Sequence, residues 1–170
     1  MISFSSFAYA SSAHWVGVDF RGLSCSGSDT ETWYGPYDFT KAGDIDHLVI
    51  VHQHHFTSDV EQLVKGKEGY IAQDLNYTVM ASPNHHRALL SMIRFQLAIN
   101  NKIISVNDDK AQLLPTPIEC YFYRAFNFSP NDAKPVALFA YYLTKINKNS
   151  EAKSYYEKAL KIQPDSSRIA

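Results

Sequence analysis

Histidine is the residue type through which this sequence could do chemistry. Six of the seven histidines fall into two groups, which are His47, His52, His54 and His55, and then His85 and His86. Imidazole nitrogen is the commonest protein ligand for transition metals, and carboxylates can add oxygen ligands. The acidic residues nearest the first group are Asp44, Asp46 and Asp59. One hypothesis is therefore a small metal-binding or metal-dependent module that uses both groups.

The spacing of these histidines matches no established metal motif. The chain has no HExxH, no CxxC and no His-x-Glu followed by a paired-cysteine element. Neighbouring residues on a helix point about 100° apart, so a His-His pair there cannot supply two ligands to one ion. In each pair we expect one ring to pack inward with a hydrogen bond and the other to face solvent. We therefore expect neither a metal nor a cofactor.

Other catalytic patterns are also missing. The serines near the N-terminal glycines do not form a nucleophile elbow, and no glycine-rich loop is present to hold phosphate. Neither Cys25 nor Cys120 has a recognisable nucleophile context, and Cys120 is expected to pack within a helix. A solvated helix start explains Asp44 and Asp46, because the helix dipole favours negative charge there. We predict that the protein is not an enzyme.

Composition favours a packed domain with little net charge. Of the 170 residues 45% are hydrophobic and 14% aromatic, and the formal net charge is -1. A chain with this balance lacks the basic footprint of a nucleic-acid-binding protein. No run approaches the roughly 18 apolar residues needed for a bilayer span. We expect no nucleic acid partner and no membrane-spanning segment.

The first ten residues and the two cysteines bear on the compartment. Residues 1–10 end in the small-x-small pattern of a signal-peptidase site but lack a basic start and a full apolar segment. They fit the tail of a signal peptide, or a mildly apolar N-terminus without that role. In a periplasmic protein Cys25 and Cys120 could form one disulfide that fastens the N-terminal segment to the helices. In a cytoplasmic protein both would be thiols.

Turn residues and apolar periodicity suggest a division near residue 83. Residues 11–82 are predicted to form an irregular, aromatic-rich cap module with short helices. A helix over 44–64 should break near Phe56, with Thr57 or Ser58 as the N-cap of a short second helix. A strand across the LVIVH sequence is the alternative. The pattern over 69–80 is ambiguous.

Residues 83–170 are predicted to be helical. Asn84 is a plausible N-cap, and Pro117 suits a first helical turn. The expected helices cover 85–100, a stretch from Pro117 through Ala125, 133–146 and 150–162, with an extended loop over 101–116.

Two segments 34 residues apart resemble each other, and this offset is the period of the tetratricopeptide repeat. The matched pairs are Tyr121/Tyr155, Phe122/Tyr156, Arg124/Lys158, Ala125/Ala159 and Pro130/Pro164. Ala152, Tyr156 and Ala159 should share one helix face, where the small residues admit a paired helix and the aromatic ring fills the space between pairs. Pro164 then ends the helix.

Residues 133–166 resemble one full tetratricopeptide repeat, and 83–132 resemble a degenerate repeat with an enlarged loop. The first helix of the clear repeat carries the expected large and small residues, Val136, Phe139, Ala140 and Leu143. The segments GPYDF, HHFTSDVEQLVKGKEG and DLNYTVMASPNHHRALLSM are similar to uncharacterised, often exported proteobacterial proteins that contain such repeats. The resemblance implies an all-α array of about 1.5 to 2 repeats whose open faces must be covered.

The resemblance also implies a scaffold that binds a protein or peptide partner in the bacterial periplasm or envelope. Repeat scaffolds bind on a concave face lined by first-helix residues, where aromatic and cationic side chains dominate the energetics. The candidate partner-binding residues are Arg87, Arg94, Arg124, Tyr141, Tyr142 and Lys145. One of the adjacent tyrosines must belong to the core. A further alternative is a self-associating structural protein that dimerises through the open repeat end.

Overall fold

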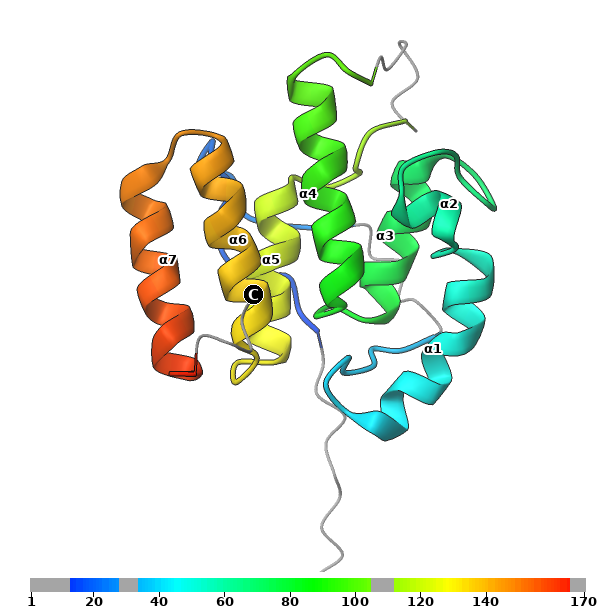
Figure 1. Ribbon diagram of the computed structural model, residues 1–170, viewed down its shortest axis with the longest axis horizontal. Helices are drawn as coiled ribbons and strands as arrows, with labels where there is room; N and C mark the ends of the chain where they lie inside the picture. The colour runs from blue at the N-terminus through cyan, green and yellow to red at the C-terminus, as the bar shows by residue number, and fades with distance from the viewer. Residues whose placement is uncertain (1–12, 28–33, 105–111, 166–170) are drawn as a thin grey trace, which may run out of the picture.

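The computed structural model describes residues 13–27, 34–104 and 112–165. Within these ranges the regular secondary structure is helical, apart from one isolated antiparallel bridge between Val18 and Ser24, and loops join the helices. The helices are α1 (Ala42–His54), α2 (Ser58–Glu61), α3 (Ile71–Ala81), α4 (His86–Asn100), α5 (Ile118–Phe128), α6 (Ala133–Lys145) and α7 (Asn149–Ile162) (Figure 1). The predicted all-α fold is confirmed. None of these helices has both the length and the apolar content that crossing a bilayer requires. The signal-peptide hypothesis concerns residues 1–10, which lie outside the described residues.

Local sequence sets several of the helix boundaries. Of the two predicted N-cap candidates, Thr57 has that position in α2, because its hydroxyl accepts a hydrogen bond from the Val60 amide. The LVIVH sequence is helical rather than extended, since Leu48 and Val51 are three residues apart and are buried together. The ambiguous stretch over 69–80 becomes α3. Pro117 is the N-cap of α5, immediately before the first helical turn.

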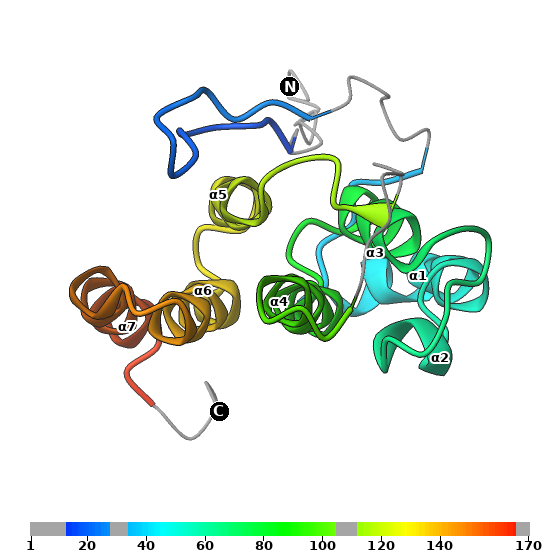
Figure 2. The same cartoon turned by 90° about the horizontal axis from the view of Figure 1, so that it is seen from above.

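One large core joins α2 to α7. Its buried side chains come from five successive helices and the start of α7, and include Val60, Leu75, Val79, Leu89, Met92, Phe122, Phe139, Leu143 and Ala152. Seen from above, α7, α6 and α4 lie in one row, and α5 is set off from this row beside α6, next to the N-terminal segment (Figure 2). The helix α6 contacts α4, α5 and α7. This core therefore runs across residue 83, because α3 and α4 contribute to it together.

The residues matched by the 34-residue offset have only partly equivalent surroundings. Ala125 and Ala159 are both buried. Phe122 is buried against α6, whereas its counterpart Tyr156 is 40% exposed, because no helix of the described chain covers that side of α7. Tyr155 packs inward on aromatic rings of α5 and α6 instead. The first-helix positions of the clear repeat are all buried, namely Val136, Phe139, Ala140 and Leu143.

The N-terminal segment 13–27 lies against α5. Cys25 and Cys120 form a disulfide with Cα atoms 5.5 Å apart, so the two cysteines pair as one of the sequence alternatives proposed. The buried guanidinium of Arg124 donates to the carbonyls of Ala13 (2.8 Å) and Val79 (2.9 Å). Burial lowers the pKa of Arg124 to about 10. These links fasten the segment to the α3–α5 part of the main core.

The helix α1 rests on a separate, smaller core. Leu48 and Val51 pack against Ala81 at the end of α3. Aromatic side chains border this contact, namely Tyr34, Tyr37, Phe39 and Tyr77. Gly35 has a φ of 106°, and a Cβ there would lie 2.4 Å from the Ala81 carbonyl oxygen. Glycine is therefore required where the chain entering α1 crosses α3.

Candidate binding surface

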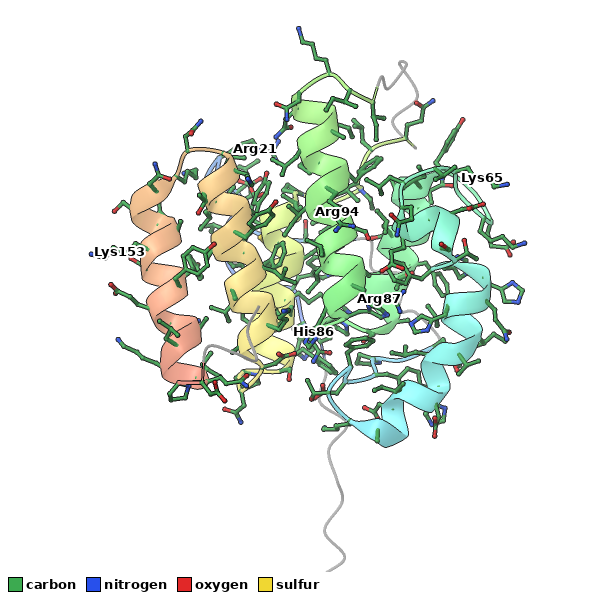
Figure 3. All side chains as sticks on the ribbon, viewed as in Figure 1. Arg21, Lys65, His86, Arg87, Arg94 and Lys153 are labelled. Carbon is green, nitrogen blue, oxygen red and sulfur yellow. A yellow bond between two sulfur atoms is a disulfide. The ribbon has the colours of Figure 1, made fainter. Side chains whose placement is uncertain are left out.

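The two histidine groups meet where the last turn of α1 approaches the first residue of α4. His52 Nε2 lies 2.7 Å from His85 Nε2, and we call this contact the histidine link. Figure 3 shows Arg87 at the end of α4 nearest α1, with Arg94 further along the same helix. Phe56 packs edge-on against the His85 ring, with centroids 4.9 Å apart. The link therefore joins two helices that are distant in sequence.

The proton positions in the histidine link follow from the start of α4. His85 is the N-cap, and its Nδ1 accepts a hydrogen bond from the Ala88 amide at 3.1 Å. A neutral ring that accepts at Nδ1 must carry its proton on Nε2, so His85 donates to His52. His52 Nε2 is then the acceptor, so this nitrogen carries no proton and the proton of the neutral His52 ring is on Nδ1. Both rings are neutral in this arrangement.

The surroundings of the histidine link favour those neutral forms. Complete burial places the pKa of His85 well below its usual 6.5. Partial burial also lowers the pKa of His52, and the nearby Arg87 guanidinium lowers it further, while Glu61 opposes them. Arg87 itself forms a two-point ion pair with Glu61.

The remaining histidines of both groups have separate partners. His54, His55 and His86 lie 2.7–2.9 Å from the carboxylates of Glu68, Asp74 and Asp132 respectively. His47 stacks on Tyr37 with ring centroids 4.7 Å apart. Within residues 13–27, 34–104 and 112–165, no group of three or more His, Cys, Asp or Glu side chains could hold a metal ion. His85 also has no lone pair to give, because its Nδ1 accepts from Ala88 and its Nε2 is protonated.

Acidic residues near the first histidine group also have other roles. Asp44 accepts a hydrogen bond from the Asp38 amide at 2.8 Å, and Asp59 pairs with Lys65 at 3.4 Å. Asp46 is exposed on α1. None of the three is hydrogen-bonded to a histidine in the contacts that the described chain makes. Asp44 and Asp59 therefore make contacts with other parts of the described chain.

Asn84 lies next to the histidine link but is not the N-cap of α4. The sequence makes Asn84 a plausible cap, whereas His85 has that position. The buried Asn84 amide donates to Asp38 at 2.7 Å and to Asp132 at 3.0 Å, and its oxygen accepts from the Phe39 amide. Asn84 therefore joins the segment before α1 to the start of α6.

The six residues predicted to contact a partner do not form one exposed set. Arg124 and Tyr142 are buried, and Arg87 is paired with Glu61. Arg94 is exposed on α4. Tyr141 is exposed on α6, where the Lys145 ammonium lies 5.2 Å from its ring centroid. Of the two adjacent tyrosines, Tyr142 is the core residue.

A different surface has the properties of a binding site. Ile45, Val49 and Ile50 of α1 are 39%, 51% and 51% exposed. Helix geometry points Val49 and Ile50 away from the buried Leu48 and Val51, and places Ile45 beside Leu48, four residues before Val49. The three exposed side chains and Asp46 define what we call the outer face of α1. The sequence signal was present, because apolar residues occupy both sides of this helix, and such helices are normally covered all round.

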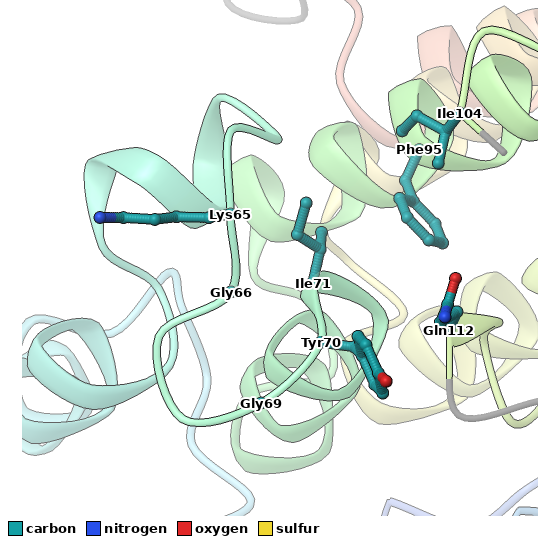
Figure 4. A pocket seen from close by; sticks show the side chains of 8 residues that line it. All are labelled: Lys65, Gly66, Gly69, Tyr70, Ile71, Phe95, Ile104 and Gln112. Atoms are coloured by element: carbon teal, nitrogen blue, oxygen red, sulfur yellow. The ribbon is translucent and has the colours of Figure 1, made fainter. Parts of the chain in front are cut away.

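A small cavity of about 290 Å³ lies between the α2–α3 loop and α4. Its side-chain walls include Tyr70, Ile71, Phe95 and Ile104. Figure 4 shows the Lys65 side chain extending away from Phe95 and Gln112. The cavity has room for an apolar group, and none of the described residues that line it carries a carboxylate, imidazole or thiol. Comparisons with models of protein families, with curated proteins and with solved structures found no match.

Proposed function

We propose that the protein is a non-enzymatic helical scaffold of tetratricopeptide-like design that binds another protein through the outer face of α1. One observation carries the proposal, namely the exposure of Ile45, Val49 and Ile50 on a helix that already buries Leu48 and Val51 against α3. A contiguous exposed apolar patch marks a site of protein contact, and Ile45 and Val49 are i, i+4 neighbours on α1 with Ile50 following Val49.

The residue types on this face are poor choices for a helix surface that stays in water. Valine and isoleucine are β-branched and reduce helix propensity by roughly a few tenths of a kcal/mol each relative to alanine. Their exposed area contributes nothing favourable until it is covered, when each Å² removed from water contributes about 25 cal/mol. A covering partner explains their presence on α1 better than the stability of the isolated chain does.

The geometry of the face suits an amphipathic helix from the partner. Ile45 and Val49 are four residues apart, and Asp46 and Ile50 form a second row beside them. Two adjacent i, i+4 rows enclose a groove that accepts a row of side chains from a second helix, with a crossing angle near about −50°. The thirteen residues of α1 extend for about 20 Å, which is enough for a contact of three turns.

The exposed carboxylate of Asp46 indicates which charge the partner helix should carry. Asp46 is exposed within the face, and no ion pair of the described chain engages it. A lysine or arginine beside the apolar stripe of the partner helix would pair with this carboxylate and fix its register. The proposed ligand is therefore an amphipathic helix with a basic residue flanking its apolar side.

The test uses a displayed library of amphipathic helical peptides selected for binding to the folded, oxidised protein. We expect the selected peptides to carry a basic residue, and we expect Val49→Lys to weaken their binding at least about tenfold. Leu160→Lys is the matched control, because Leu160 is an apolar residue of similar exposure on α7. Loss of binding in the α7 variant with binding retained in the α1 variant would contradict the proposal. Self-association of the unliganded protein that Val49→Lys abolishes would identify a second copy as the ligand instead.

A further inference from the structure

We infer that the histidine link makes the attachment of α1 sensitive to acid, so that proton uptake by His52 releases the end of α1 from α4. The contact that carries this inference is the single proton held between His52 Nε2 and His85 Nε2 over 2.7 Å. Its effect on ligand binding rests on the proposed function, because α1 carries the docking surface. The opening itself is a property of the free chain.

Proton counting explains why the link cannot survive a second proton. A proton added to His52 occupies Nε2, the atom that accepts from His85, so two N–H donors then face each other. The hydrogen bond can re-form only if His85 transfers its own proton to Nδ1. That proton would point at the Ala88 amide, and α4 would lose the N-cap bond that His85 provides. Either outcome removes one hydrogen bond that the neutral pair makes.

The charged groups around the histidine link have opposing effects on the protonation of its two rings. Glu61 of α2 favours the charged form of His52, whereas Arg87 of α4 disfavours it. At His85, desolvation, His52, Arg87 and His86 all disfavour the charged form. Asp132, at the start of α6, lies against His86 and not against the link. Burial is the largest influence on both rings, so the neutral pair is the stable form near neutral pH.

The neighbouring histidines provide an internal contrast. His54 and His55 contact the carboxylates of Glu68 and Asp74, and a protonated ring would still donate to those oxygens. Acid therefore disrupts the His–His contact while it preserves the His–carboxylate contacts next to it. The release should be confined to the α1–α4 contact, with the turn after α1 held to α3 by Asp74.

The helix α1 is suited to open separately because so little apolar surface attaches it. Its buried side chains, Leu48 and Val51, belong to a core distinct from the one that joins α2 to α7. Since the pKa of His52 is lowered in the folded protein, the open form takes up a proton first as the pH falls. The contribution of the link is therefore complete above the ordinary histidine pKa of 6.5 and declines as the pH drops below it.

Hydrogen exchange of the free, oxidised protein tests the inference without any ligand. After correction for intrinsic rates, protection of α1 amides should fall between about pH 7 and about pH 5.5 by up to about tenfold per pH unit, the limit for one proton. Protection of α6 should change much less. In His52→Gln the amide oxygen can accept from His85 at every pH, so α1 should lose its acid response. His54→Gln, the matched control, should keep it.

Two results would overturn the inference. One is an acid response of α1 that persists unchanged in His52→Gln. The other is a ring-nitrogen NMR spectrum of the wild-type protein at neutral pH in which His85 carries its proton on Nδ1. The second measurement needs no variant, so it decides the matter even if His52→Gln does not fold. Neither involves a peptide, so failure here is distinguishable from failure of the docking surface.

Discussion

The main core and the α1 region are held by different kinds of interaction. Between α2 and α7, large apolar side chains from successive helices bury one another. Phe139, for example, contacts an aromatic ring of α5 and another of α7. The helix α1 has two buried apolar side chains of its own, aromatic neighbours and several histidine contacts. Apolar burial does not depend on protonation, whereas the histidine link does. The comparison indicates that α1 can open while the other helices stay folded.

The largest expected effect is on the free energy of unfolding, and it should distinguish a substitution in the main core from one in the core beneath α1. Phe139→Ala should lower the free energy of unfolding by about 3–5 kcal/mol, because it removes a fully buried ring at the centre of the main core. Leu48→Ala should instead increase hydrogen exchange within α1 and leave the main denaturant transition close to wild type. Equilibrium unfolding combined with hydrogen exchange measures both. A single transition shifted equally by both variants would show that α1 and the main core unfold as one unit.

A smaller effect is expected at the contact between α6 and α7. Ala159 is buried where these two helices pack together, so Ala159→Trp should overpack the contact and cost about 1–3 kcal/mol or more. We expect the melting temperature to fall and the exchange of α7 amides to rise. The matched control is Leu160→Trp, at an exposed neighbouring position. A melting curve unchanged in Ala159→Trp would count against the close helix pairing and against the repeat interpretation.

The smallest effect is expected on the outer face of α1. Val49→Lys should change the free energy of unfolding by less than about 0.5 kcal/mol, because lysine favours helix more than valine does and the side chain is half exposed. Thermal unfolding of the variant and the wild type gives the comparison. A large destabilisation would mean that Val49 supports the fold itself, and the exposed face would then no longer require a partner.

Sequence alone predicted the parts of this molecule that depend on local patterns. The all-α class follows from helical periodicity, and capping limited the start of α2 to Thr57 or Ser58, of which Thr57 is the N-cap. The burial of Val136, Phe139 and Leu143 agrees with the positions that the repeat resemblance gave them. Helix geometry also predicted that one of the adjacent tyrosines belongs to the core. That residue is Tyr142, and Tyr141 is exposed. These features depend on residues within a few positions of one another.

The features that sequence did not predict depend on contacts between distant segments. His52 and His85 are 33 residues apart, and nothing in either group indicates that one ring of each would face the other. Arg124 aligned with the exposed Lys158, yet it is buried, because the N-terminal segment and the end of α3 both contact its guanidinium. On α1, apolar residues occupy both sides, and periodicity cannot tell which side the rest of the chain will cover.

Mapping a selected peptide onto the protein by amide chemical shifts tests the central claim most directly. The account predicts that the largest shift changes on adding the peptide at neutral pH fall within α1, around Ile45, Val49 and Ile50. They should be absent when Val49→Lys replaces the wild-type protein. Shift changes centred on α6, around Tyr141 and Lys145, or on the open side of α7 around Tyr156 and Leu160, would contradict it. In that case the binding face would belong to the helical repeat and not to α1.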